Sequence, residues 1–154
     1  MTYVQYMQTE LSWLCISANA DGLTAVEFCS APTDSVEAQP NQHTQQACTE
    51  LAAYFAGSLH EFTVPLAAQG THFQHSVWSA LGTIPFGQTC SYLDIATKIN
   101  NPKGVRAVGL ANGKNPIAII VPCHRVIGKN GKLTGYASGL DNKSWLLEHE
   151  AKYA

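Results

Sequence analysis

The sequence predicts an α/β domain over residues 1–66, a short linker over residues 67–70 and a mainly α domain over residues 71–154. Three observations support this division. Short β-prone segments around a turn occur in the first third, helical periodicity dominates the rest, and every lysine and arginine follows residue 97. With 154 residues, of which 45% are hydrophobic, the chain can bury a core without disulfide or metal support.

An antiparallel ribbon and one helix make up the predicted N-terminal domain. Two β-prone segments, over residues 12–17 and 23–28, flank the pair Asp21-Gly22, which is typical of a hairpin turn. The remaining elements expected in this domain are a loop over 30–41, a helix over about 44–56 and a short strand over 61–64.

Three short helices open the predicted C-terminal domain. Thr71 is a suitable N-cap for the first, and Ser91 with Asp94 forms a variant of the capping box for the second. The third helix covers about residues 104–113, and the second and third together predict a helix-turn-helix. The apolar side chains expected to face the core are Leu93, Ala96 and Ile99 on the second helix and Val105, Val108 and Ala111 on the third.

A reactive pair follows an apolar run over residues 117–121, which predicts a short buried strand. Cys123 and His124 are adjacent, and an imidazole can take the proton of a thiol directly or through one water molecule. A free cysteine is also commonly a small buried apolar residue, so the pair alone leaves both interpretations open. The predicted C-terminal helix, over about 141–152, carries two acids that could orient the imidazole, Glu148 and Glu150.

The cysteines and the apolar pattern exclude several classes. The five cysteines form no CxxC pair, so neither a disulfide framework nor a zinc site is predicted, and free thiols indicate a reducing compartment. No apolar run approaches the ~20 residues of a membrane span. The start of the chain does not resemble a signal peptide. We therefore expect a cytoplasmic protein without a metal or a membrane partner.

The distribution of charge points to an anionic partner for the second part of the chain. The net charge of -2 and the pI of about 6.3 argue against a polyanion as partner. However, residues 1–97 hold eight of the eleven acids and no lysine or arginine, whereas residues 98–154 hold all nine cations. The alternative is that these cations only solvate one surface.

Several motifs follow one another in the second part of the chain, between about residues 71 and 150. They are Ser91-Tyr92, Arg106-Ala107-Val108-Gly109, Asn115-Pro116, Pro122-Cys123-His124-Arg125-Val126, Tyr136-Ala137-Ser138-Gly139-Leu140 and Lys143-x-Trp145-Leu146-Leu147-x-His149-Glu150. Together they resemble one family, the O6-alkylguanine-DNA alkyltransferases, also called methylated-DNA–protein-cysteine methyltransferases. The resemblance implies a ribonuclease H-like fold for the N-terminal domain and a winged-helix-like helix-turn-helix in the C-terminal domain.

The resemblance implies a DNA repair protein that is consumed by its own reaction. Cys123 matches the nucleophile, which takes the alkyl group from O6-methylguanine or O4-methylthymine and keeps it, so each molecule acts once. His124 matches the histidine that deprotonates the thiol through a water molecule. Glu150 matches the carboxylate that orients this histidine. No cofactor is implied.

The resemblance also implies that a monomer binds duplex DNA through the minor groove and flips the damaged nucleotide out of the stack. Arg106 matches the arginine that fills the space left by the base, and Tyr92 matches a tyrosine that helps to rotate the nucleotide. The residues expected to bind DNA are Tyr92, Arg106, Ala107, Ala111, Asn115 and Arg125. Those expected to line the base pocket are Val126, Tyr136, Ala137 and Ser138.

Two other functions are compatible with parts of this pattern. A non-catalytic alkyltransferase-like protein would recognise the same damage, but such proteins replace the nucleophile, and this chain retains Cys123. A thiol hydrolase or protease could use Cys123 with His124, and it would turn over repeatedly because water releases an acyl-enzyme.

Overall fold

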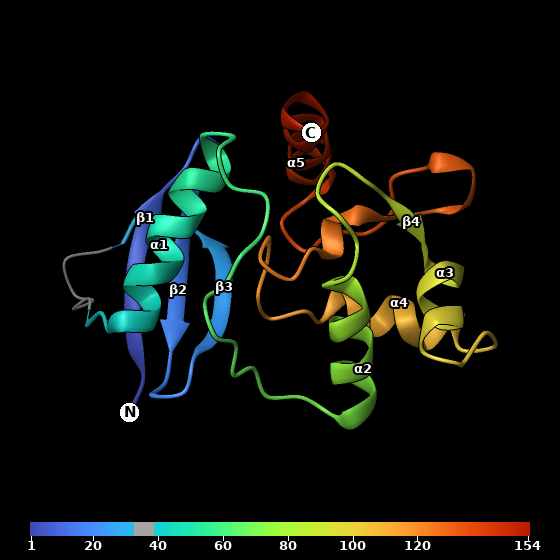
Figure 1. Ribbon diagram of the computed structural model, residues 1–154, viewed down its shortest axis with the longest axis horizontal. Helices are drawn as coiled ribbons and strands as arrows, with labels where there is room; N and C mark the ends of the chain where they lie inside the picture. Colours follow the sequence, from blue (N-terminus) through green and yellow to red (C-terminus); the bar gives the residue numbers. More distant parts are fainter. Residues whose placement is uncertain (33–38) are drawn as a thin grey trace. The chain divides into compact units, whose positions relative to one another are not determined.

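The chain forms two compact units in the computed structural model, which describes residues 1–32 and 39–154 (Figure 1). One unit holds Met1–Gln69 together with Pro116–Ala118, and the other holds Gly70–Asn115 and Ile119–Ala154. The central part of the loop predicted over residues 30–41 lies outside the described residues.

A three-stranded antiparallel sheet forms the base of the first unit. Its order is β1-β2-β3, and the β2–β3 hairpin confirms the predicted ribbon. Asn19 shapes the turn, because its side-chain oxygen accepts hydrogen bonds from the amides of Asp21 (2.8 Å) and Gly22 (3.1 Å). The sequence interpretation missed the first strand. The strands are β1 (Tyr3–Gln8), β2 (Trp13–Ala18) and β3 (Leu23–Cys29).

One helix, α1 (Gln42–Phe55), covers a face of this sheet (Figure 1). It begins slightly before the predicted helix because Asn41 is its N-cap and forms a capping box with Thr44. Its apolar stripe, which includes Ala47 and Leu51, is fully buried. Alternate residues of β2 are also fully buried, so helix and sheet share one core.

The strand predicted over residues 61–64 does not form. The Glu50 carboxylate on α1 accepts hydrogen bonds from the backbone amides of Thr63 (2.9 Å) and Val64 (3.2 Å). In a β-strand these amides would donate to the carbonyls of a neighbouring strand. Here they donate to the Glu50 side chain instead. The prediction was wrong because this partner comes from a distant part of the chain.

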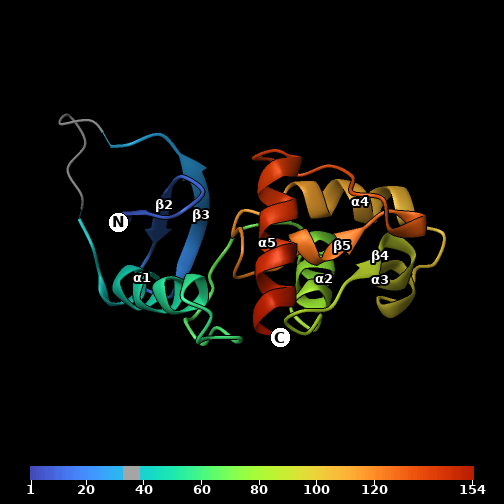
Figure 2. The ribbon, with the colours of Figure 1, turned by 90° about the horizontal axis from the view of Figure 1, so that it is seen from above.

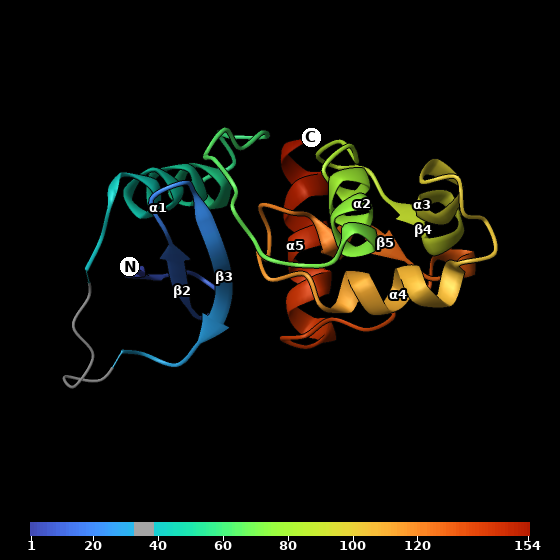
Figure 3. The same cartoon turned by 90° about the horizontal axis from the view of Figure 1, so that it is seen from below.

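The second unit is a group of helices with a small parallel sheet, β4-β5 (Figures 2 and 3). The predicted N-cap at Thr71 and the predicted capping box at Ser91 are present, and Thr71 also forms a capping box with Gln74. Both α2 and α3 pack against α4, and the Trp78 indole N–H donates to the Ala111 carbonyl (2.9 Å). The elements are α2 (His72–Leu81), β4 (Cys90–Ser91), α3 (Tyr92–Lys98), α4 (Val105–Gly113), the 3-10 turns η1 (Cys123–Arg125) and η2 (Lys129–Gly131), β5 (Val126–Ile127) and α5 (Leu140–Tyr153).

Two residues expected to face the core are exposed. Leu93 on α3 is 53% exposed and Val105 on α4 is 37% exposed, whereas Ile95 and Ala96 are buried. Successive residues turn by about 100° around a helix, so Leu93 points nearly opposite to Ile95. In such short helices, the sequence alone left the choice between the two faces undetermined.

The apolar run over residues 117–121 is buried at alternate positions, but it is not a strand. Ile117 makes one bridge to Val26, and the chain then turns through Ile119, whose φ is 71°. A β-branched residue with positive φ is uncommon and needs support from its surroundings. The turn leads directly into η1, where Cys123 lies. In the parts of the chain that the structure describes, no helix is long and apolar enough to cross a membrane.

Candidate active site

Cys123, His124 and Arg125 form the 3-10 turn η1, and all three side chains are buried. Two contacts fix the backbone just before the turn. The Cys123 amide donates to the Val121 carbonyl (2.8 Å), and the Asn115 side-chain amide donates to the same carbonyl (2.8 Å). Asn115 therefore ties the end of α4 to the segment that presents the thiol, although this segment is a turn and not the expected strand.

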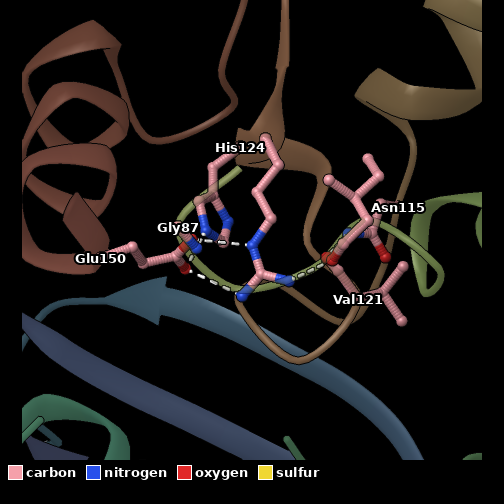
Figure 4. A network of polar contacts seen from close by, with 7 residues as sticks. Gly87, Asn115, Val121, His124 and Glu150 are labelled. Carbon is pink, nitrogen blue, oxygen red and sulfur yellow. Dashed lines mark hydrogen bonds and ion pairs between the residues drawn. The ribbon is translucent and has the colours of Figure 1, made fainter. Parts of the chain in front are cut away.

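The Glu150 carboxylate on α5 lies at the centre of a buried polar network (Figure 4). One oxygen lies 2.7 Å from His124 Nε2 and accepts from Arg125 Nη2 (3.0 Å), and the other accepts from Arg125 Nε (2.8 Å) and the Gly87 amide (3.4 Å). Burial disfavours the charged carboxylate, but the hydrogen bonds from His124 and Arg125 outweigh it and hold the pKa of Glu150 well below its ordinary value. Glu150 is therefore an anion at neutral pH.

His124 is a neutral imidazole with one nitrogen available as a base. Burial lowers its pKa and outweighs the opposing effect of Glu150, so the ring is uncharged at neutral pH. Nε2 faces the ionised Glu150 and must carry the proton, which leaves a lone pair on Nδ1. Nδ1 is buried and has no hydrogen-bond partner among the described residues. A buried acceptor in this state is a site for a water molecule or a ligand.

The thiol of Cys123 is protonated at neutral pH. Burial raises its pKa, while a hydrogen bond from Asn115 and the positive charge of Lys143 act in the opposite direction. Because the thiolate is the reactive form, this cysteine needs a base before it can act as a nucleophile. The neighbouring His124, with its available Nδ1, has the required protonation state.

Two residues expected to bind DNA are buried in the protein. The Arg125 guanidinium is bound to Glu150, and its Nη1 donates to the Ile84 carbonyl (2.7 Å), so it cannot contact a DNA backbone. Ala111 is 2% exposed and faces α2. Both interpretations were wrong because burial depends on partners from distant segments. Arg125 instead holds the carboxylate that faces His124.

Three other residues expected to bind DNA lie at or near the surface of α3 and α4. Arg106 and Ala107 are exposed on α4, and Tyr92 is half-buried with its hydroxyl 2.9 Å from the Thr134 hydroxyl. Exposed lysines accompany them on the same helices and the adjoining turns, at Lys98, Lys103 and Lys114.

The residues expected to line the base pocket lie in β5 and in the loop before α5. Val126 is fully buried, Tyr136 is half-buried, and burial raises the pKa of the Tyr136 phenol far above its ordinary value. Ala137 is exposed, and the Ser138 hydroxyl accepts a hydrogen bond from the Asn142 side chain (3.1 Å).

Sequence reasoning missed two residues of this region, Lys143 and Thr134. The Lys143 ammonium is fully buried and donates to the carbonyls of Val126 (2.7 Å) and Thr134 (2.7 Å). Lys143 belongs to the C-terminal motif that carried the family resemblance, so its position in that motif was the available signal.

Comparisons with known proteins identify the family to which this chain is similar. The family model described as "6-O-methylguanine DNA methyltransferase, DNA binding domain" matches residues 72–152, and the one described as "6-O-methylguanine DNA methyltransferase, ribonuclease-like domain" matches residues 2–68. A methylated-DNA–protein-cysteine methyltransferase of Methanosarcina acetivorans is 50% identical over 154 residues, which cover 96% of this chain and 97% of the relative. One from Mycobacterium tuberculosis is 61% identical over 108 residues, covering 70% of this chain and 66% of the relative.

Solved structures give the same result. The crystal structure of Mycobacterium tuberculosis OGT in complex with DNA matches with a TM-score of 0.89 and 45% identity, covering 99% of this chain and 94% of that one. An O6-methylguanine DNA methyltransferase from Methanococcus jannaschii matches with a TM-score of 0.73 and 30% identity, over 96% and 93% of the two chains. The predicted fold class, a ribonuclease-like domain followed by a helical DNA-binding domain, is confirmed. The chain belongs to the 6-O-methylguanine DNA methyltransferase family.

Proposed function

We propose that Cys123 is the alkyl acceptor of this methylated-DNA–protein-cysteine methyltransferase, which takes the alkyl group from O6-alkylguanine, and also from O4-alkylthymine, in duplex DNA. One observation carries the proposal. A neutral His124, held by an ionised Glu150, keeps a buried Nδ1 without a partner among the described residues, and the residue that precedes it in the chain carries the protonated thiol. This is the state that a general base requires before it activates a nucleophile.

The reaction then has two linked steps. A water molecule at Nδ1 accepts the Cys123 proton and passes one to His124, and Glu150 stabilises the imidazolium that forms. The thiolate attacks the alkyl carbon in line, so that an S–C bond forms while the C–O6 bond breaks. The bonding electron pair stays on the base, which takes up a proton and becomes normal guanine. A thioether is not a leaving group, so each molecule acts once and needs no cofactor.

Access to the alkyl carbon requires that the nucleotide leave the stack. The exposed Arg106 on α4 is the residue suited to fill the space in the duplex, and the exposed Ala107 permits a close approach of the helix backbone. Tyr92, next to Ser91 at the start of α3, is suited to assist rotation of the nucleotide. Exposed lysines at the end of α3 and on either side of α4 supply the positive charge that a DNA backbone attracts.

Backbone groups are suited to recognise the flipped base. The carbonyls of Cys123 and Val126 can accept hydrogen bonds from the guanine amino group, and the amide of Ala137 or Ser138 can donate to O6. The Ser138 hydroxyl already accepts from Asn142, which favours a backbone contact over a hydroxyl contact at this position. The half-buried Tyr136 is suited to border the pocket.

Stoichiometry tests the proposed function. A duplex with one O6-methylguanine is mixed with increasing amounts of protein, and the repaired fraction is measured after the reaction stops. We expect one lesion repaired per protein molecule, and Cys123→Ser should bind the duplex without repairing it. Repeated turnover of an ester or amide by the same thiol would favour a hydrolase. Binding of the lesion without any repair would favour the non-catalytic damage-recognition protein.

A further inference from the structure

Lys143 on α5 is the one fully buried lysine of this chain, whose lysines the structure describes at every position. Burying a cation is costly unless polar groups compensate for the lost water. Here the compensation comes from two backbone carbonyls, those of Val126 and Thr134, each 2.7 Å from the ammonium. No carboxylate forms an ion pair with Lys143 in the described residues. An apolar side chain of similar length would fill the same space without this desolvation cost, so packing alone does not account for a lysine here.

The two carbonyls belong to the two segments that border the proposed base pocket. Val126 lies in β5, three residues after Cys123, and Thr134 lies in the loop that leads to Tyr136. The Thr134 hydroxyl is in turn hydrogen-bonded to the Tyr92 hydroxyl on α3 (2.9 Å). Hydrogen bonds therefore link α5 to β5 and also to the pocket loop, and the loop is linked in turn to the helix that carries Tyr92.

We propose that Lys143 is a positioning residue for alkyl transfer: it holds β5 and the pocket loop at a fixed separation beside Cys123 and, through Thr134, fixes the hydroxyl of Tyr92. This inference rests on the proposed function, because it concerns the geometry in which that reaction takes place. Reaction rates depend steeply on such geometry, since displacements of about 1 Å can cost a hundredfold in rate. A short, charge-assisted hydrogen bond from Lys143 to each segment is suited to hold the two segments in place.

The charge of Lys143 also acts on the thiol. It favours the thiolate of Cys123 against the effect of burial. Burial lowers the pKa of Lys143 itself, and Cys123 acts in the opposite direction. Two other titratable groups interact with this pair, His124 from η1 with Lys143 and Tyr136 from the loop before α5 with Cys123. The charges of Glu150 and Arg125 act on His124 in turn. Loss of Lys143 therefore raises the pKa of Cys123, in addition to releasing the two segments.

Two variants of the full chain test the inference. Lys143→Met keeps the length of the side chain but removes the charge and the donors, and Thr134→Val removes only the hydroxyl that contacts Tyr92. Lys152→Met is the matched control, because Lys152 is an exposed lysine on the same helix. The measurements are the single-turnover rate on a duplex with O6-methylguanine, the affinity for that duplex, and the pH dependence of Cys123 modification by iodoacetamide.

For Lys143→Met we expect a rate lower by about ten- to a hundredfold, the effect of losing hydrogen bonds to a charged group. Its affinity for the duplex should be unchanged, and its iodoacetamide profile should move to higher pH. Thr134→Val should slow transfer from the duplex while leaving that profile in place. Lys152→Met should match the wild type.

If Lys143→Met shows the rate and pH profile of the wild type, the inference about Lys143 is wrong, although alkyl transfer by the wild type still supports the proposed function. If the wild type transfers no alkyl group, the proposed function itself is wrong. Circular dichroism shows whether Lys143→Met folds. If it does not, Thr134→Val decides, and a wild-type rate for that variant overturns the inference.

Discussion

The buried carboxylate of Glu150 should contribute to folding stability as well as to catalysis. Glu150→Gln keeps the size and shape of the side chain but removes its charge, and Arg125 then remains buried without its counter-ion. Removing one partner of a buried ion pair costs about 3–5 kcal/mol in the free energy of unfolding, because the other charge stays out of water. We expect a loss of this size at pH 7, together with slower alkyl transfer because His124 loses its orienting anion.

The sign of the pH dependence follows from the lowered pKa of Glu150 in the folded protein. A group of this kind contributes its full stabilisation above the pKa of the unfolded chain, which is about 4.3 for a glutamate. Below that pH the contribution falls by about 1.4 kcal/mol per pH unit, because the unfolded state binds a proton that the folded state does not. The wild type should therefore lose stability between about pH 4.3 and the lower folded-state pKa, and Glu150→Gln should lose less over the same interval.

Urea unfolding of both proteins at a series of pH values from neutral to acid measures this difference. The two curves of stability against pH should be separated at pH 7 and should converge as the pH falls. Equal unfolding free energies at pH 7 would refute the argument. Parallel curves in acid would also refute it, since Glu150 would then not be the group that titrates.

Two further predictions concern DNA binding and packing. Arg106→Ala should slow transfer from a duplex by about ten- to a hundredfold, because flipping a nucleotide costs a few kcal/mol, while a single-stranded substrate should react as before; single-turnover kinetics on both substrates check this, and an equal loss on both would contradict it. Gly87→Ala should cost about 1–3 kcal/mol of stability in urea unfolding, because Gly87 has φ +80° and a Cβ would lie 2.6 Å from the Ala154 Cβ. Gly82→Ala is the matched control, since φ there is -61° and no clash arises, and comparable losses in both variants would contradict the account.

Local signals predicted most of the helices. Thr71 and Ser91 cap α2 and α3 as expected, because capping depends on a few residues in a row. The Asp21-Gly22 turn likewise located the hairpin. The adjacent Cys123 and His124 were found for the same reason.

The errors arise where distant residues decide the local structure. Glu50 occupies the amides that residues 61–64 would use in a sheet, and one bridge to Val26 is all that remains of the expected strand over 117–121. Arg125 was expected to bind DNA, but its guanidinium is buried and paired with Glu150, which lies 25 positions further along the chain. Pairing and burial of this kind depend on tertiary contacts, which spacing in one sequence does not specify.

Intact-mass analysis followed by peptide mapping tests the central claim most directly. The wild type and Cys123→Ser are each incubated with a duplex that carries O6-methylguanine and then digested for mapping. We predict that the wild type gains one methyl group per molecule, located on Cys123, and that Cys123→Ser gains none. A methyl group on any of the other four cysteines, or no adduct while the lesion disappears, would contradict the account.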